Sequence, residues 1–173
     1  MRAIDAQLSR MANSMRDKVV AAAINKTAAK AKTEMKRQIT AEFAVKSGDV
    51  SAQLRVVKAS AKGFQLVAAL AAFGTRRGRR SRNVALFRAR QTKQGVTVQI
   101  KRSAGRKLIR HAFIGNNGKT VFVREGKSRL PIKPVETIDV PQMFNAKRIN
   151  AAVLAKIRRE LPVEVARAMR AIR

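Results

Sequence analysis

The sequence has no cysteine, tryptophan or tyrosine, and a single histidine, His111, among its 173 residues. The absence of cysteine excludes disulfides and thiolate metal ligands. One histidine alone makes neither a metal cluster nor a catalytic pair, and no two carboxylates stand in a motif of recognised spacing. We therefore expect no catalytic residues, no metal site, no cofactor and no small-molecule substrate.

Long hydrophobic runs are also missing. The longest purely apolar run, Leu66–Phe73, has eight residues, whereas a helix needs about 20 to cross a bilayer. We expect no transmembrane segment and no membrane partner.

Acidic residues are absent from a long central window. Between Val50 and Arg124 the chain has no aspartate or glutamate but eighteen lysines and arginines. The whole chain has 39 basic and 10 acidic residues, a formal charge of +29. Such a charge attracts phosphate backbones at long range, which favours contact with DNA or RNA. The alternative, a solvated surface rich in lysine, usually mixes charges of both signs and has a net charge of only a few units.

Segment 74–83 contains five arginines in ten residues, together with Gly74 and Gly78. Arginine forks bind phosphate oxygens in pairs, and glycine lets the backbone follow a groove. We predict a loop that lies on nucleic acid, with a solvated loop as the alternative. No base-reading motif accompanies it, so the contacts are expected to be independent of sequence. The candidate nucleic-acid-binding residues are Arg76, Arg77, Arg79, Arg80, Arg82, Arg88, Arg90, Lys101, Arg102, Arg106 and Lys107.

The aromatic residues bear on the form of the nucleic acid. All seven are phenylalanines, and Phe87, Phe113 and Phe122 follow the apolar strand pattern instead of a basic face. Proteins that bind single strands usually present aromatic stacking platforms. The pattern therefore favours double-stranded DNA as the partner.

The order of patterns is helix, sheet, helix, which predicts an α+β fold in a single domain, 1–173. Neither glycine nor proline occurs before Gly48, so 1–48 is expected to be a long N-terminal helical segment, with a break near 21–25 as an alternative. A turn at 46–49 and a short helix from Asp49 to Leu54 should follow. The early apolar stripe consists of Ile4, Leu8, Met11, Met15 and Val19.

Segment 50–126 is expected to form a small antiparallel β-sheet, with one apolar and one cationic face. Apolar and basic residues alternate over 87–90 and apolar and polar residues over 96–101, and strands are also predicted over 55–61 and 64–70. Asn116–Gly118 is a hairpin signal. The surrounding 115–120 resembles a phosphate loop, but only two residues separate its glycines, so we interpret it as a turn.

Three prolines make 127–145 an extended connector, and 146–173 is predicted to be the C-terminal helix. Pro162 lies inside it and should kink the helix or start a new one. Apolar residues recur there every four positions. Four of them are candidate oligomer contacts: Ile157, Leu161, Val165 and Met169.

Several short segments occur together in order along most of the chain. They are 22–28 in the first helix, the arginine-rich loop, His111–Ile114, Val121–Arg124, Arg129–Ile132, Val140–Phe144 and Arg158–Pro162. With this ordered set the chain resembles the bacteriophage minor tail protein Z family, which includes the tail-completion proteins of long, flexible, noncontractile tails.

The resemblance implies a structural virion protein at the head-proximal end of the tail, assembled in the host cytoplasm and needed to seat the genome end. It implies a homo-hexameric ring and contacts with other tail and head-tail connector proteins. The alternative is a cellular protein that binds double-stranded nucleic acid independently of sequence. An enzyme acting on nucleic acid is a third, less favoured class.

Overall fold

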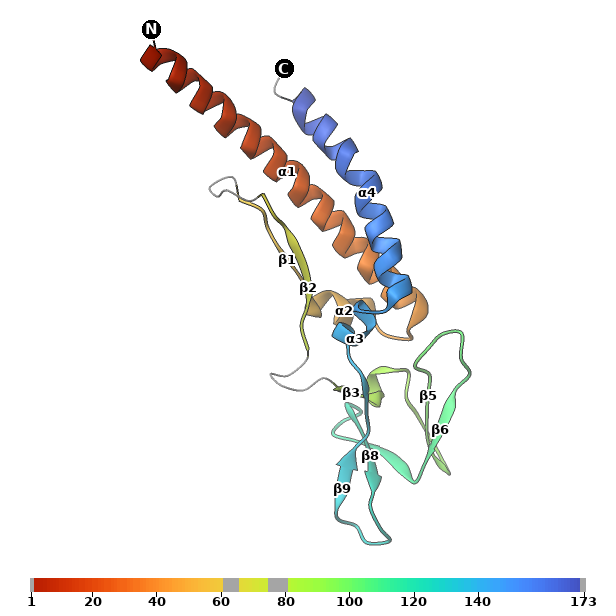
Figure 1. The fold of residues 1–173 in the computed structure, drawn as a ribbon. Coiled ribbons are helices and arrows are strands. Elements are labelled where there is room, and N and C mark those ends of the chain that lie inside the picture. The colour runs from red at the N-terminus through yellow and green to blue at the C-terminus, as the bar shows by residue number, and fades with distance from the viewer. Residues whose placement is uncertain (1, 61–65, 75–80, 172–173) are drawn as a thin grey trace. The chain divides into compact units, whose positions relative to one another are not determined.

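The computed structural model describes residues 2–60, 66–74 and 81–171, with side chains from residue 13 onward except at 14 and 81. The chain is α+β, as predicted, and forms two compact units (Figure 1). Unit 1 comprises 1–35, 54–71 and 150–173, and unit 2 comprises 36–53 and 72–149. The prediction of a single domain is not tested by this division and stays a prediction.

The first helix, α1 (Arg2–Glu42), runs through 41 residues. The alternative of a break near 21–25 is therefore wrong. The sequence has no helix breaker there, and alanine has the highest helix propensity. The Asn25 side chain donates to the Ala59 carbonyl at 3.0 Å and accepts from the Ala59 N–H at 2.7 Å. Because it bonds Ala59, it does not compete for the backbone groups of its own helix.

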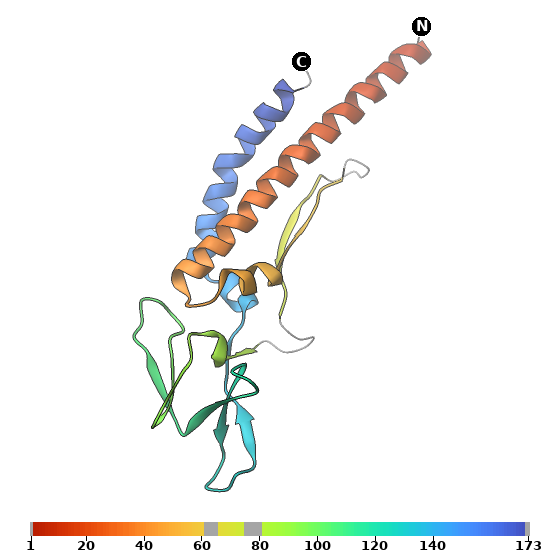
Figure 2. The same ribbon diagram turned by 180° about the vertical axis from the view of Figure 1, so that it is seen from behind.

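The last helix, α4 (Lys147–Arg170), continues through Pro162, so no new helix begins there. Within unit 1, α4 lies beside α1 and runs in the opposite direction (Figures 1 and 2). The predicted C-terminal helix is confirmed.

The predicted short helix is present as α2 (Ser47–Gln53). It begins two residues before Asp49, so the turn predicted over 46–49 is wrong from Ser47 onward, and Asp49 lies in the first helical turn instead of capping the helix. The helix α2 leads into β1 (Leu54–Val57), which pairs with β2 (Ala69–Ala72). The strand predicted over 55–61 agrees with β1 in part, whereas the one predicted over 64–70 overlaps β2 only at its end. Residues 61–65 lie outside the described residues.

Unit 2 contains several small antiparallel sheets instead of one. Their strands are β3 (Ser81–Asn83) with β10 (Glu136–Ile138), then β4 (Arg90–Thr92), β5 (Gly95–Val98) and β6 (Lys107–Arg110), then β7 (Ala112–Gly115), β8 (Thr120–Arg124) and β9 (Ile132–Pro134). The predicted hairpin joins β7 to β8, with positive φ at Asn116, Asn117 and Gly118. A buried cluster holds these sheets together and consists of Val84, Val96, Val98, Ala112 and Val121.

The strand predicted over 87–90 is wrong. A 3-10 turn, η1 (Val84–Leu86), precedes it, and Phe87 is fully buried beyond that turn. Asn83 sets this geometry because its side chain caps η1 and also bonds the N–H and carbonyl of Val121, at 2.8 and 3.1 Å. The apolar residue that suggested a strand, Phe87, is a buried residue of a turn. The strand β4 begins only at Arg90, the last residue of the predicted segment.

The connector predicted over 127–145 is extended only in part. It supplies β9 and β10 and then the short helix α3 (Val140–Phe144). Asp139 caps α3, since its carboxylate accepts from the Val140 N–H at 2.8 Å while its own N–H donates to Gln142 Oε1 at 2.9 Å. This reciprocal capping box satisfies donors that a helix start leaves free.

Candidate nucleic-acid interface

The sheet β4–β5–β6 presents an exposed face in unit 2. Its register places Arg90 opposite Thr97, and Thr97 opposite Leu108. Side chains two positions apart in a strand point to the same side, so Arg110 shares the exposed face with Arg90. The other face packs into the buried cluster through Val96, Val98 and Ile109.

Lys101 and Arg102 are joined to the end of α1, within unit 2. The Arg102 N–H donates to the Glu42 carbonyl at 2.8 Å, and its Nε donates to the Thr40 carbonyl at 2.7 Å. The guanidinium thus satisfies a carbonyl that the last helical turn leaves free. Lys101 Nζ lies 3.9 Å from Glu42 Oε1, and more than half of its side chain is exposed. Both residues therefore stabilise the fold as well as adding charge.

Three further candidates, Arg88, Arg106 and Lys107, are exposed. Arg106 Nη2 donates to the Arg88 carbonyl and so ties the loop before β6 to the turn before β4. This bond brings Arg88 and Arg106 together beside the sheet. Lys107 lies opposite Val98, so its side chain leaves β6 on the side away from Arg90 and Arg110.

Arg82 lies in a different environment from the other candidates. It is buried in β3 opposite Thr137 of β10, and its Nε is 3.4 Å from Oδ1 of the fully buried Asp139. A guanidinium enclosed with a carboxylate cannot reach a phosphate without leaving the interior. We therefore correct its assignment from DNA contact to structural ion pair. The other candidates of the loop, Arg76, Arg77, Arg79 and Arg80, lie outside the described residues.

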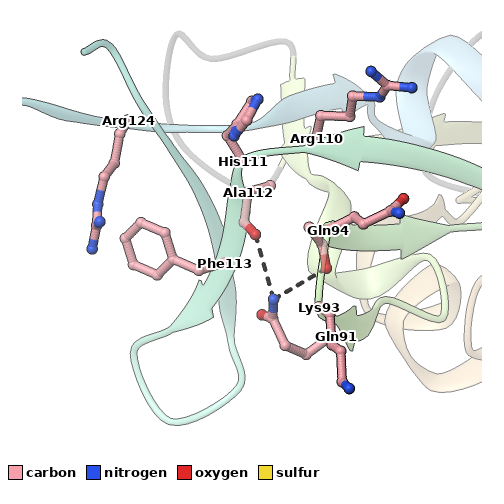
Figure 3. A pocket seen from close by; sticks show the side chains of 9 residues that line it. Gln91, Lys93, Gln94, Arg110, His111, Ala112, Phe113 and Arg124 are labelled. Atoms are coloured by element: carbon pink, nitrogen blue, oxygen red, sulfur yellow. Dashed lines mark hydrogen bonds between the residues drawn. The ribbon is translucent and has the colours of Figure 1, made fainter. Parts of the chain in front are cut away.

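A pocket of about 480 Å³ opens in unit 2 between the β4–β5 turn, the β6–β7 junction and the end of β8 (Figure 3). Its cations are Lys93, Arg110 and Arg124, and His111 lies among them. The charged ends stand apart around the pocket instead of meeting at one point (Figure 3). No lining residue is acidic, and these cations form no salt bridge within the part of the chain that the structure describes.

The pocket also contains an aromatic ring, Phe113. The guanidinium carbon of Arg124 lies 5.0 Å from the centre of this ring. Beside it, Gln91 donates to the Ala112 carbonyl at 3.4 Å (Figure 3). The Gln91 side chain also accepts from the Ile114 N–H at 2.9 Å, so it joins β4 to β7.

The candidates predicted from the sequence include neither Phe113 nor any of the three cations of the pocket. The strand pattern assigns Phe113 to the apolar side, and Lys93 and Arg110 belong to no motif. Phe113 and Arg124 lie in two of the segments that carry the family resemblance, and the window without acidic residues contains all of these residues, but neither signal brings them together.

The predicted oligomer stripe on α4 shows graded burial. Ile157, Leu161 and Val165 are half-buried, whereas Met169 is 47% exposed. The first two line an apolar groove of about 290 Å³ in unit 1, together with Ile24, Ala28, Ala31, Leu66 and Leu70. The stripe therefore packs partly on the protein's own first helix and opens to solvent toward its end.

An ion-pair network joins the two helices in unit 1. Lys30 Nζ lies 2.7 Å from Glu160 and 2.6 Å from Glu164, whose side chain is only 1% exposed. Hydrogen bonds from Lys156 and then Lys30 lower the pKa of Glu160 to about 2. The hydrogen bond from Lys30 also lowers the pKa of Glu164, and the two glutamates raise the pKa of Lys30.

Among residues 2–60, 66–74 and 81–171, no group of three or more His, Cys, Asp or Glu side chains could hold a metal ion. Over the same residues, no helix combines the length and apolar character that a membrane crossing requires. Fold and surface together define a strongly basic α+β protein whose exposed cations suit a polyanion.

The chain belongs to the prophage minor tail protein Z (GPZ) family, whose model matches residues 2–172. Neither a curated protein nor a solved structure matches it. The family identifies it as a phage minor tail protein with a structural role in the virion tail.

Proposed function

We propose that this chain completes the tail at its head-proximal end, where copies form a ring and their basic surfaces seat the end of the genome. The observation that carries the proposal is the set of exposed cations in unit 2, on the sheet face and in the pocket. Lys93, Arg110 and Arg124 have no acidic partner within the described residues, so a polyanion meets them without breaking existing ion pairs.

The mechanism is electrostatic positioning without turnover. Basic side chains that contact phosphates release counterions, which gives affinity independent of sequence. A DNA end inside the tail must be held whatever its base sequence is, and contacts to the phosphate backbone meet that requirement. A ring of copies would surround the DNA with the same surface from every side.

The end of α4 supports assembly into such a ring. Beyond the groove in unit 1, Val165 is half-buried and Met169 is exposed. Apolar side chains left open at the end of a stripe favour contact with a neighbouring copy. We therefore propose Val165 and Met169 as the part of the stripe that other copies cover.

A phage deleted for this chain tests the seating role. We expect heads and tails to form and join, with low infectivity per particle and increased nuclease access to the DNA end. Complementation with the Arg88→Gln/Arg90→Gln variant should restore incorporation but only part of the infectivity, because two exposed charges of the basic face are lost.

The Lys127→Gln/Arg129→Gln variant is the matched control. It removes two exposed charges from the segment before β9 and should complement fully. Full infectivity of the deletion phage, or a complete absence of tails, would reject the seating role. Binding of a defined cellular RNA by the monomer would instead favour the cellular nucleic-acid-binding alternative.

A further inference from the structure

We propose that the pocket beside Phe113 binds an unpaired nucleotide of a DNA strand, with the base on the Phe113 ring and the flanking phosphates on Arg110 and Arg124. The inference rests on the proposed function for taking DNA as the ligand. It goes further because it assigns this site to single-stranded DNA, whereas the sequence pattern favours duplex.

The size of the pocket supports this ligand. A volume of about 480 Å³ is larger than one phosphate group needs and can take a nucleoside with phosphate on either side. A base inside a duplex is stacked and paired, so it enters a pocket only after leaving the stack. A base in a single strand or at a frayed end is already free to enter.

The distribution of charge indicates more than one phosphate. Lys93, Arg110 and Arg124 come from three different places in the fold, and their charged ends stand apart around the pocket (Figure 3). A single compact anion would be matched by cations that meet at one point. Separated cations instead match successive phosphates of a strand.

Phe113 supplies the surface for the base. Its ring packs against Phe122, with centroids 5.8 Å apart, and Gln91 bonds the backbone on both sides of Phe113, so the ring is held in place. Arg124 now lies near the ring, but it is exposed and has no salt bridge within the described residues. A base on an aromatic ring is a stronger contact than an exposed cation–π pair. The base can therefore take the place of Arg124, which turns to a phosphate.

An acidic peptide is the competing ligand for such a surface. Its carboxylates would pair with the cations, but a chain of acidic residues has no aromatic ring to stack on Phe113. The presence of Phe113 in the pocket therefore favours a nucleotide over an acidic peptide.

The test measures binding of the full chain to a fluorescent oligothymidylate of about ten nucleotides, within the site size of single-strand binders, and to a blunt duplex. Arg110→Gln/Arg124→Gln should weaken binding of the single strand about tenfold more than binding of the duplex. Phe113→Leu should also weaken single-strand binding about tenfold, the value of one base stack. Because Phe113 packs on Phe122, the thermal unfolding of the Phe113→Leu variant is measured too. If that variant does not fold, the Arg110→Gln/Arg124→Gln variant still tests the inference.

The control is Lys127→Gln/Arg129→Gln, which removes the same charge away from the pocket and should weaken both ligands equally. Equal losses for both ligands in the pocket variants would overturn the inference, as would displacement of the oligonucleotide by polyglutamate at equal charge. If the protein binds duplex DNA normally and the pocket variants leave single-strand binding unchanged, this inference alone is rejected. Absence of all DNA binding would reject the proposed function as well.

Discussion

Replacing Asp139 by asparagine should destabilise unit 2 strongly although the side chain keeps its shape. Asparagine caps a helix as well as aspartate does, so the cap of α3 survives. What is lost is the charge 3.4 Å from Arg82, in a site where both side chains are less than a tenth exposed. The substitution therefore isolates the ion pair from the cap.

The size of the effect follows from the geometry. At 3.4 Å and an effective dielectric constant of about 20, the attraction is about 5 kcal/mol. Removing both ions from water costs several kcal/mol each, so the net contribution of the pair is small. Removing one partner is different, because Arg82 then stays buried without its counter-charge, which costs about 3–5 kcal/mol. Its Nε and Nη1 have no hydrogen bond within the described residues that would compensate.

The assay is urea unfolding followed by far-UV circular dichroism, since the chain has no tryptophan or tyrosine for fluorescence. Asp49→Asn in the first turn of α2 is the matched control and should cost under about 1 kcal/mol. Adding Arg82→Met to Asp139→Asn should recover most of the loss, because the unpaired charge is gone. A cost below about 1 kcal/mol for Asp139→Asn, or additive losses in the double variant, would refute the buried ion pair.

Three further predictions concern the helices and the loop. Since the pKa of Glu160 is lowered to about 2, its ion pairs stabilise fully above about pH 4.5 and lose this effect as the pH falls toward 2. The stability gap between the wild type and Lys30→Met should accordingly shrink over that range in urea titrations; a constant gap would contradict the pairing. Glutamate at Val165 and Met169 should abolish assembly in size-exclusion chromatography while helicity and melting stay unchanged, and loss of folding would place these residues in the core of the monomer. The third prediction replaces four arginines of the loop by serine: Arg76, Arg77, Arg79 and Arg80. The slope of log affinity for duplex DNA against log salt should fall by up to about 4, since each phosphate contact contributes about 0.9. An unchanged slope would exclude the loop from DNA contact.

Local signals were sufficient for several elements. The helix α1 follows from a long stretch without glycine or proline, and the β7–β8 hairpin from Asn116–Gly118, whose residues tolerate positive φ. In both cases the deciding interactions lie within a few residues of each other. The charge of the chain and its family resemblance are likewise properties of the sequence alone.

Pairing between distant segments decided what the sequence pattern could not. In the sequence, Arg82 cannot be distinguished from the other arginines of the loop. The pairing of β3 with β10 brings it to Asp139, which is 57 positions away. Phe87 fits a strand until Asn83 bonds Val121 and forms the preceding turn.

The sequence by itself determined the helix-sheet-helix order, the absence of thiols and the concentration of positive charge. Only the tertiary structure decided which cations face solvent and which aromatic ring joins them. Phe113 follows an apolar pattern, yet β7 places it beside Arg124, in a pocket that Arg110 also lines. The physical reason is that alternation specifies a side of one strand, whereas a pocket forms where several strand ends and turns meet.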